Sequence, residues 1–176
     1  MLNSPADERQ VRAPSGELIA LGPLTGSETS DLFSLFSHVV ATGEGFPHSP
    51  PLTREQFEST WIKPAVTVVV AARLEGRLVG AYYLKPNFVG KAAHIANAGY
   101  MVASAARRRG VGRALIEDSV VRAPLAGFDA IQFNLVFSSN PARALYEELG
   151  WRETGRVPDA VEGEDAVIYW RSVKTT

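Results

Sequence analysis

The sequence of 176 residues contains no cysteine. A disulfide framework, a thiol nucleophile, a thiolate zinc site and an iron–sulfur cluster are therefore excluded. The sequence also lacks a charge excess, since its formal net charge is −1, and the whole molecule has no field that would attract nucleic acid or an anionic membrane. No apolar run approaches the ~18 residues of a membrane span. The start of the chain lacks the apolar core of a secretory signal. We expect a cytoplasmic protein without a metal, nucleic acid or membrane partner.

The composition is otherwise that of a packed globular domain, because 45% of the residues are hydrophobic and the length suits one domain. Residues 1–16 are polar and are interrupted by Pro5, Pro14 and Gly16. This pattern predicts a flexible N-terminal arm over residues 1–16 and a single domain over residues 17–176.

Hydrophobic periodicity and turn residues divide the rest of the chain into strands and helices. The expected strands are residues 18–21, 66–72, 78–84, 94–102, 130–137 and 166–170, and the expected helices are residues 27–43, 53–61, 111–122 and 142–149. Pro124 should stop the third helix. The strands first pair locally and then alternate with helices. The order predicts an α/β (α+β) fold with a mixed, mostly antiparallel central sheet of about six to seven strands, flanked by about four helices.

An arginine- and glycine-rich segment lies between an expected strand and an expected helix. It reads Arg107-Arg108-Arg109-Gly110-Val111-Gly112-Arg113. Its glycines allow the backbone to approach a ligand closely, and the free amides of a helix N-terminus favour a diphosphate. The alternative is a solvated basic turn that only starts a helix. A dinucleotide-binding fingerprint would need a third glycine where Leu115 stands, and no P-loop pattern is present. RNA binding by the arginines is disfavoured because no aromatic stacking platform accompanies them.

Two motifs in order carry a family resemblance. The first is Tyr100-Met101-Val102 followed by residues 107–115, and the second is residues 140–151, which end in Trp151. They resemble the acetyl-CoA signature and the next motif of the GCN5-related N-acetyltransferases. The resemblance implies a sheet splayed at the cofactor site, acetyl-CoA as cofactor, direct acetyl transfer to an amine, and a possible homodimer. The implied cofactor-binding residues are Met101, Val102, Arg107, Arg108, Arg109, Gly110, Val111, Gly112, Arg113, Asn140 and Tyr146.

The catalytic assignments leave alternatives open. Tyr146 occupies the position of the family's general acid, but it also falls on an apolar helical stripe where it could serve core packing alone. Asn140 is a helix N-cap, a partner of the cofactor arm, or both. The strand over residues 94–100 carries no carboxylate, so the general base is water, His94 or none. Because this carboxylate is missing, a CoA-binding module without catalytic turnover is an alternative function.

A narrower resemblance concerns the acceptor. The runs 94–100 and 133–136 are similar to those of enzymes that acetylate proline analogues such as azetidine-2-carboxylate. This resemblance implies that Asn97 and Asn134 hold an imino acid with the backbone of Leu135 nearby, and Asn134 also counts as catalytic. Otherwise each asparagine would satisfy backbone groups at a strand bulge. Protein N-termini, polyamines and aminoglycosides remain alternative acceptors.

The loop over residues 43–51 is too rich in glycine and proline for regular structure. We expect Phe46, His48 and Glu44 of this loop to line the acceptor pocket, because binding residues are often carried by loops. The alternative is an ordinary solvated loop.

Overall fold

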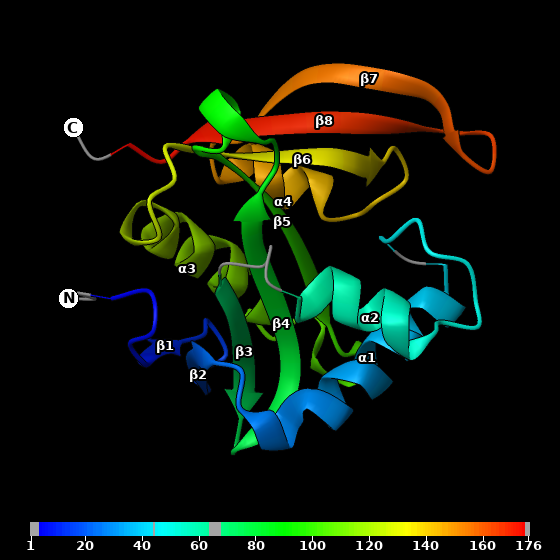
Figure 1. Cartoon of the computed structure of the whole chain (residues 1–176). Coiled ribbons are helices and arrows are strands. Elements are labelled where there is room, and N and C mark those ends of the chain that lie inside the picture. Colours follow the sequence, from blue (N-terminus) through cyan, green and yellow to red (C-terminus); the bar gives the residue numbers. More distant parts are fainter. Residues whose placement is uncertain (1–3, 44, 64–67, 175–176) are drawn as a thin grey trace.

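The structure, a computed structural model, describes residues 4–43, 45–63 and 68–174. Its strands are β1 (Arg9–Arg12), β2 (Leu18–Pro23), β3 (Val68–Leu74), β4 (Arg77–Pro86), β5 (Ile95–Val102), β6 (Ala130–Phe137), β7 (Arg152–Val161) and β8 (Glu164–Ser172). Its helices are α1 (Thr29–Ala41), α2 (Arg54–Trp61), α3 (Val111–Leu125) and α4 (Arg143–Glu148), with short 3-10 turns η1 (Gly26–Glu28), η2 (Gly90–Ala92) and η3 (Ser104–Ala106). One sheet contains the strands in the order β1-β2-β3-β4-β5-β6-β8-β7 (Figure 1).

Neighbouring strands of this sheet are antiparallel, except that β5 and β6 are parallel. This arrangement confirms the predicted fold class. The described sheet has eight strands, more than expected, because the sequence pattern did not reveal β1 and β7. Strand β7 is mostly exposed and polar, so it has no hydrophobic alternation to mark it. Its pairing with β8 makes it a strand.

The two faces of the sheet carry separate hydrophobic cores. Alternate residues of β4 point to opposite faces, so Tyr82 packs in the core beneath α3 and Tyr83 in the core beneath α1 and α2. Figure 1 shows α3 on one side of β3, β4 and β5, and α1 with α2 on the other. Helix α2 begins as predicted, because the Thr53 hydroxyl accepts a hydrogen bond from the Gln56 amide at 3.1 Å.

Strands β5 and β6 separate shortly after they meet. Their parallel pairing covers only the pairs Ile95 with Ala130, Ala96 with Ile131, and Asn97 with Gln132. Beyond these pairs the two strands diverge, as Figure 1 shows. The rest of β5 therefore has no neighbouring strand on this side. The sheet is splayed where the sequence motifs converge.

The third helix is longer than predicted. Helix α3 continues through Pro124 and ends at Leu125, whereas the sequence analysis expected it to stop at Arg122. A proline removes one amide donor and clashes with the preceding turn. In the last turn of a helix only one such bond is lost, and here the amide of Ala126 still donates to the Arg122 carbonyl at 3.0 Å.

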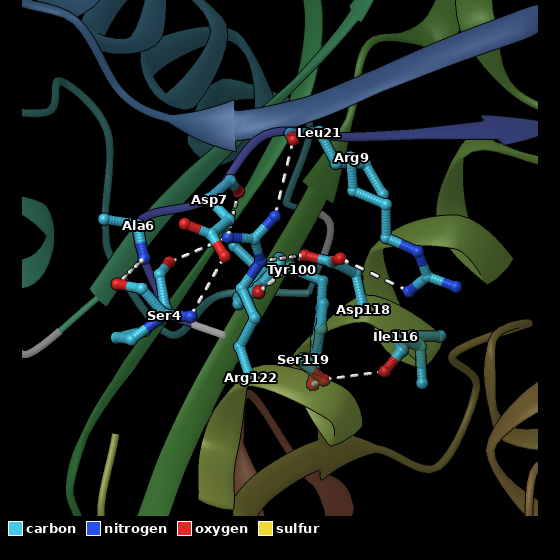
Figure 2. A network of polar contacts seen from close by, with 12 residues as sticks. Ser4, Ala6, Asp7, Arg9, Leu21, Tyr100, Ile116, Asp118, Ser119 and Arg122 are labelled. Carbon is cyan, nitrogen blue, oxygen red and sulfur yellow. Dashed lines mark hydrogen bonds and ion pairs between the residues drawn. The ribbon is translucent and has the colours of Figure 1, made fainter. Parts of the chain in front are cut away.

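The N-terminal segment is not the loose arm that its composition predicts. Strand β1 pairs with β2, and the guanidinium of Arg122 holds the backbone before it, donating to the carbonyls of Pro5 at 2.7 Å and Asp7 at 2.6 Å (Figure 2). Arg122 also contacts Asp118 at 2.6 Å, and both side chains are fully buried. Long-range polar contacts therefore help to order a segment whose own contribution to the core is limited to Val11 and Ala13.

None of the helices among the described residues is both long enough and apolar enough to cross a membrane.

Candidate active site

A first cavity of 420 Å³ lies between the diverging strands β5 and β6. Met101 and Val102 of β5 line one side, and Phe137 of β6 lines another. Arg107 and Gly112 contribute from the loop before α3 and from its first turn. The cavity therefore joins the free edge of β5 to the N-terminus of α3. Further residues that line it are Val39, Gly43, Gly45, Tyr100, Ile116, Ser139, Asn140, Pro141, Ala142, Leu145 and Tyr146.

The first turn of α3 presents unpaired backbone amides. Gly110 caps the helix with a φ of 83°, a left-handed conformation that glycine adopts without strain. Helical hydrogen bonding begins with the Ala114 amide, which donates to the Gly110 carbonyl at 3.0 Å. Among the residues that the structure describes, no group accepts from the amides of residues 111–113. These amides and the helix dipole favour an anionic group such as a phosphate.

The arginines of this segment have different surroundings. Arg107 lines the first cavity. Arg109 forms an ion pair with Glu17, with its Nε atom 3.1 Å from a carboxylate oxygen. Arg113 contacts Glu148 at 2.6 Å. The structure thus brings only part of the predicted set to this cavity.

The members of the predicted cofactor set that line the first cavity are Met101, Val102, Arg107, Gly112, Asn140 and Tyr146. The members outside its lining are Arg108, Arg109, Gly110, Val111 and Arg113. Val111 is buried in the core beneath α3, and Gly110 lies so close to the N-terminal segment that a β-carbon would come within 3.1 Å of Ala13.

A second cavity, also of 420 Å³, adjoins the first on the face covered by α1 and α2. It is lined by the loop after α1, by α2, by β4 and β5, and by the bulged part of β6. Gly45, Tyr100, Asn140 and Tyr146 line both cavities. Two compartments that meet at shared residues suit a reaction between two molecules.

The two asparagines predicted to bind substrate both line the second cavity. The Asn97 amide group donates to the Gln132 carbonyl at 3.1 Å, across the last paired residues of β5 and β6. Asn134 lies at a bulge of β6 beside Leu135, and it exchanges hydrogen bonds of 3.1 and 2.6 Å with Asn87. Each asparagine therefore has a structural contact in addition to its position on the cavity wall.

Phe46 and His48 line the second cavity as predicted, while Glu44 lies outside the described residues. Burial lowers the pKa of His48, and the charge of Lys85 lowers it further. The imidazole is therefore neutral at pH 7. His94 lines neither cavity, and its Nδ1 atom lies 2.9 Å from the Lys91 carbonyl oxygen. The structure therefore does not place this candidate base in either cavity.

Tyr146 stands where the two cavities join. Its ring packs against Phe133 with centroids 4.9 Å apart and against Tyr169 with centroids 5.8 Å apart. Burial raises the pKa of Tyr146, and Tyr169 adds to the rise. The phenol therefore keeps its proton at neutral pH. Within the described part of the chain, its hydroxyl has no hydrogen-bond partner, so the proton is available to a bound molecule.

Asn140 precedes α4, whose N-cap is Ala142, and its role toward the cofactor arm stays a prediction. Its side-chain oxygen accepts from the Ala142 amide at 2.9 Å, close to the start of α4, and the residue lines both cavities.

Among the lining residues of the second cavity that sequence reasoning missed are Tyr83 and Lys85. Both follow the alternation of β4 and share a face with Asn97 and Gly99 of β5, because the register places Lys85 opposite Asn97 and Tyr83 opposite Gly99. This alternation was visible in the sequence, but the face that would line a cavity was not.

Comparisons with known proteins agree with this architecture. Residues 31–151 match the Acetyltransferase (GNAT) family. The chain is 30% identical over 162 residues to N-acetyltransferase aca1 of Schizosaccharomyces pombe, an alignment that covers 80% of this chain and 78% of that protein. A GCN5-related N-acetyltransferase from Kribbella flavida has a TM-score of 0.81 at 34% identity and covers 88% of this chain and 97% of its own. The putative acetyltransferase yncA of Salmonella typhimurium, solved with its cofactor acetyl-CoA, has a TM-score of 0.78 at 14% identity, covering 90% and 95% of the two chains.

The fold and these matches define an acyltransferase. The chain belongs to the GNAT family of acetyltransferases and is an acetyl-CoA-dependent N-acetyltransferase that acts on amine substrates.

The site fits acetyl-CoA in two physical respects. The edge of β5 beyond Asn97 is unpaired on the side of β6 and can bond to an extended, amide-bearing chain. The unpaired amides of residues 111–113 can receive a pyrophosphate. Acetyl-CoA supplies an activated thioester whose acetyl group passes to the amine.

Proposed function

We propose that this enzyme acetylates the ring nitrogen of a small imino acid, of the kind represented by azetidine-2-carboxylate. The observation that carries the proposal is the second cavity, which contains Asn97 and Asn134 on adjacent strands and shares Tyr146 with the first cavity. An amine bound there would face a thioester bound along β5. The proposal also rests on the likeness of residues 94–100 and 133–136 to the enzymes that acetylate proline analogues.

The two asparagines suit a substrate amine that both donates and accepts hydrogen bonds. Among the described residues, the Asn97 side-chain oxygen accepts one hydrogen bond, from the Tyr83 hydroxyl at 3.4 Å, so it has capacity to accept from a ring nitrogen. Neutral amides orient such a nitrogen without removing its proton. In this proposal Asn97, Asn134 and the backbone of Leu135 hold the acceptor, and water takes the proton that the nitrogen loses.

Tyr146 is the proposed proton donor to the leaving sulfur. A general acid must hold its proton until the leaving group develops charge, and burial ensures this by raising the pKa of the phenol. The position of Tyr146 at the junction of the two cavities supports this role, because its hydroxyl would lie beside both reactants. The same burial packs the ring of Tyr146 against Phe133 and Tyr169, so the proposed catalytic role is compatible with a packing role.

The size of the second cavity favours a small acceptor. A volume of 420 Å³ lies near the lower end of the range of about 300–1,000 Å³ typical of small-molecule sites. Met101 and Tyr83 are buried beneath α1 and α2, which close this face of the sheet. A folded protein could reach the site only with an extended terminus.

The experiment is a thiol-release assay with acetyl-CoA and a panel of acceptors. The panel contains azetidine-2-carboxylate, hydroxyproline, a linear amino acid, a polyamine and a peptide with a free N-terminus. We expect kcat/KM to be highest for the cyclic imino acids. An equal or higher value for the polyamine or the peptide would overturn the proposal.

Asn134→Ala tests the acceptor side of the site, and Asn87→Ala is its matched control. Both variants lose the Asn87–Asn134 hydrogen bonds, but only N134A removes a group that lines the cavity. We expect N134A to lower kcat/KM for the imino acid about 10-fold or more with unchanged acetyl-CoA affinity, while N87A keeps most of the activity. Equal losses would reduce Asn134 to a structural role.

A further inference from the structure

Lys85 is the one charged side chain in the lining of the second cavity, within the described part of the protein. The other polar groups of that lining are hydroxyls, amides and the imidazole of His48, which is neutral at pH 7 for the reasons given above. No described aspartate or glutamate lines this cavity. The described part of the wall therefore carries a single positive charge and no carboxylate to balance it.

Several other partly or fully buried cations among the described residues have a carboxylate partner, whereas the partly buried Arg171 donates to the Leu149 carbonyl instead. Arg73 contacts Glu28 at 2.5 Å, Arg122 contacts Asp118 at 2.6 Å, and Arg143 contacts Glu153 at 3.5 Å. Lys85 is half-buried, yet no described carboxylate lies within 4.0 Å of its ammonium group. Desolvating a charge without a counter-ion is unfavourable. An anionic ligand in the cavity would offset that cost.

The position of the ammonium group is defined by its neighbours. Its nitrogen lies 4.8 Å from the centroid of the Tyr83 ring, a cation–π contact that holds it over a buried side chain. Lys85 is also the direct cross-strand partner of Asn97. Directly opposed residues of an antiparallel pair have β-carbons about 4.5–5.5 Å apart. The cation and the Asn97 amide therefore act on the same region of the cavity.

We propose that Lys85 binds the carboxylate of the acceptor and thereby selects amino or imino acids over amines that lack an acid group. The inference rests on the proposed function in assigning the second cavity to the acceptor. A carboxylate and an amine on neighbouring atoms would meet Lys85 and Asn97 together. The same charge repels polycations, so it disfavours polyamines and aminoglycosides.

The test compares an acid with its neutral amide. Azetidine-2-carboxylate and azetidine-2-carboxamide differ in charge and have nearly the same shape, and a linear amino acid with its amide forms a second pair. We expect the wild-type enzyme to prefer each acid, in kcat/KM, by roughly 30-fold, the value of a charge-assisted hydrogen bond. Lys85→Met should remove most of this preference by slowing reaction of the acids. Lys85→Arg should retain it.

Lys91→Met is the matched control, because Lys91 is exposed on η2 and lines neither cavity. It should leave the preference unchanged. Thermal unfolding and acetyl-CoA affinity, measured for every variant, verify that the fold and the cofactor site are intact. A wild-type enzyme that treats acid and amide alike, or a K85M variant that slows both equally, overturns the inference. A preference for linear over cyclic acids overturns the proposed function. The inference about Lys85 is then tested by the linear amino acid and its amide, where the wild type should still prefer the acid and K85M should not.

Discussion

The Nε2 atom of His48 lies 3.2 Å from the hydroxyl oxygen of Thr60. That hydroxyl donates its own proton to the Gln56 carbonyl at 2.8 Å, so it can only accept from the ring. Nε2 therefore carries the imidazole proton, and Nδ1 is the bare nitrogen. Nδ1 is buried and has no partner among the described residues. This network keeps a neutral ring of one tautomer on the wall of the second cavity.

Thr60→Val tests this tautomer. The substitution keeps the shape of the side chain but leaves Nε2–H without an acceptor, at a cost of about 1–3 kcal/mol in the free energy of unfolding. Imidazole ¹⁵N resonances should show protonated Nε2 in the wild type and lose that preference in the variant. Ser59→Ala is the control, since Ser59 binds the same Gln56 carbonyl but is exposed. A wild-type ring protonated at Nδ1 would contradict the assignment.

Tyr146→Phe separates catalysis from packing. Phenylalanine retains the ring contacts with Phe133 and Tyr169 but lacks the hydroxyl. We expect kcat to fall about 10²-fold, the lower end for loss of a general acid, with unchanged acetyl-CoA affinity. Tyr169→Phe is the control, because the Tyr169 hydroxyl donates to Glu147 at 2.7 Å and lines neither cavity. Full activity of Y146F would leave Tyr146 as a packing residue.

Much of the fold was predictable because its signals are local. Threonine at position 53 caps α2 as its sequence context indicates, and the Glu75-Gly76 turn joins β3 to β4 with positive φ at both residues. Strand β1 gave no such signal. It is a short, polar segment whose order depends on pairing with β2 and on the buried Arg122, which lies more than a hundred residues away.

The site was predictable only where a motif marked it. Asn97 and Tyr146, which the motifs marked, line the cavities, and their binding and catalytic roles stay predictions. Lys85 could not be found in this way, because its importance arises from what surrounds it. The cavity is assembled from the loop after α1, from α2 and from three strands. That the described lining contains no carboxylate is a property of this assembly rather than of the sequence near Lys85.

Arg122→Met should be strongly destabilising. It leaves the buried Asp118 without its 2.6 Å partner and frees the carbonyls of Pro5 and Asp7. Removal of one member of a buried ion pair costs about 3–5 kcal/mol, which urea denaturation would measure. The N-terminal residues should also become sensitive to proteolysis.

The control is Arg113→Met, which breaks exposed ion pairs with Glu117 and Glu148 and should cost about 0–1 kcal/mol in the free energy of unfolding. Similar losses in the two variants would contradict this account.

Glu28 should make the stability of the protein depend on pH in the acid range. Arg73 binds its carboxylate through two hydrogen bonds of 2.5 and 2.6 Å and lowers the Glu28 pKa from 4.5 to about 2. The unfolded chain therefore takes up a proton before the folded protein does. The contribution of Glu28 is complete above its unfolded pKa and is lost as the pH falls through about 2.

The corresponding experiment measures the free energy of unfolding of the wild type and of Glu28→Gln at pH 7 and pH 3. The wild type should be more stable by about 2 kcal/mol at pH 7, and the difference should shrink at pH 3. Glu148→Gln, which removes an exposed carboxylate, should show a small difference at both pH values. If the difference in the free energy of unfolding between the wild type and E28Q does not change with pH, Arg73 does not set the titration of Glu28.

Gly99→Ala should damage the acceptor side of the site while it spares the cofactor side. A β-carbon at position 99 would lie 2.6 Å from a ring carbon of Tyr83, and Tyr83 is buried, so its ring would have to move. That ring lines the second cavity and supports the Lys85 ammonium. We expect overpacking to cost about 1–3 kcal/mol of stability and KM for the acceptor to rise several-fold, with unchanged acetyl-CoA affinity.

Gly26→Ala is the control, because a β-carbon there meets nothing within 4 Å. Weakened acetyl-CoA binding with a normal acceptor KM would show that Tyr83 serves the first cavity, which would place the acceptor elsewhere.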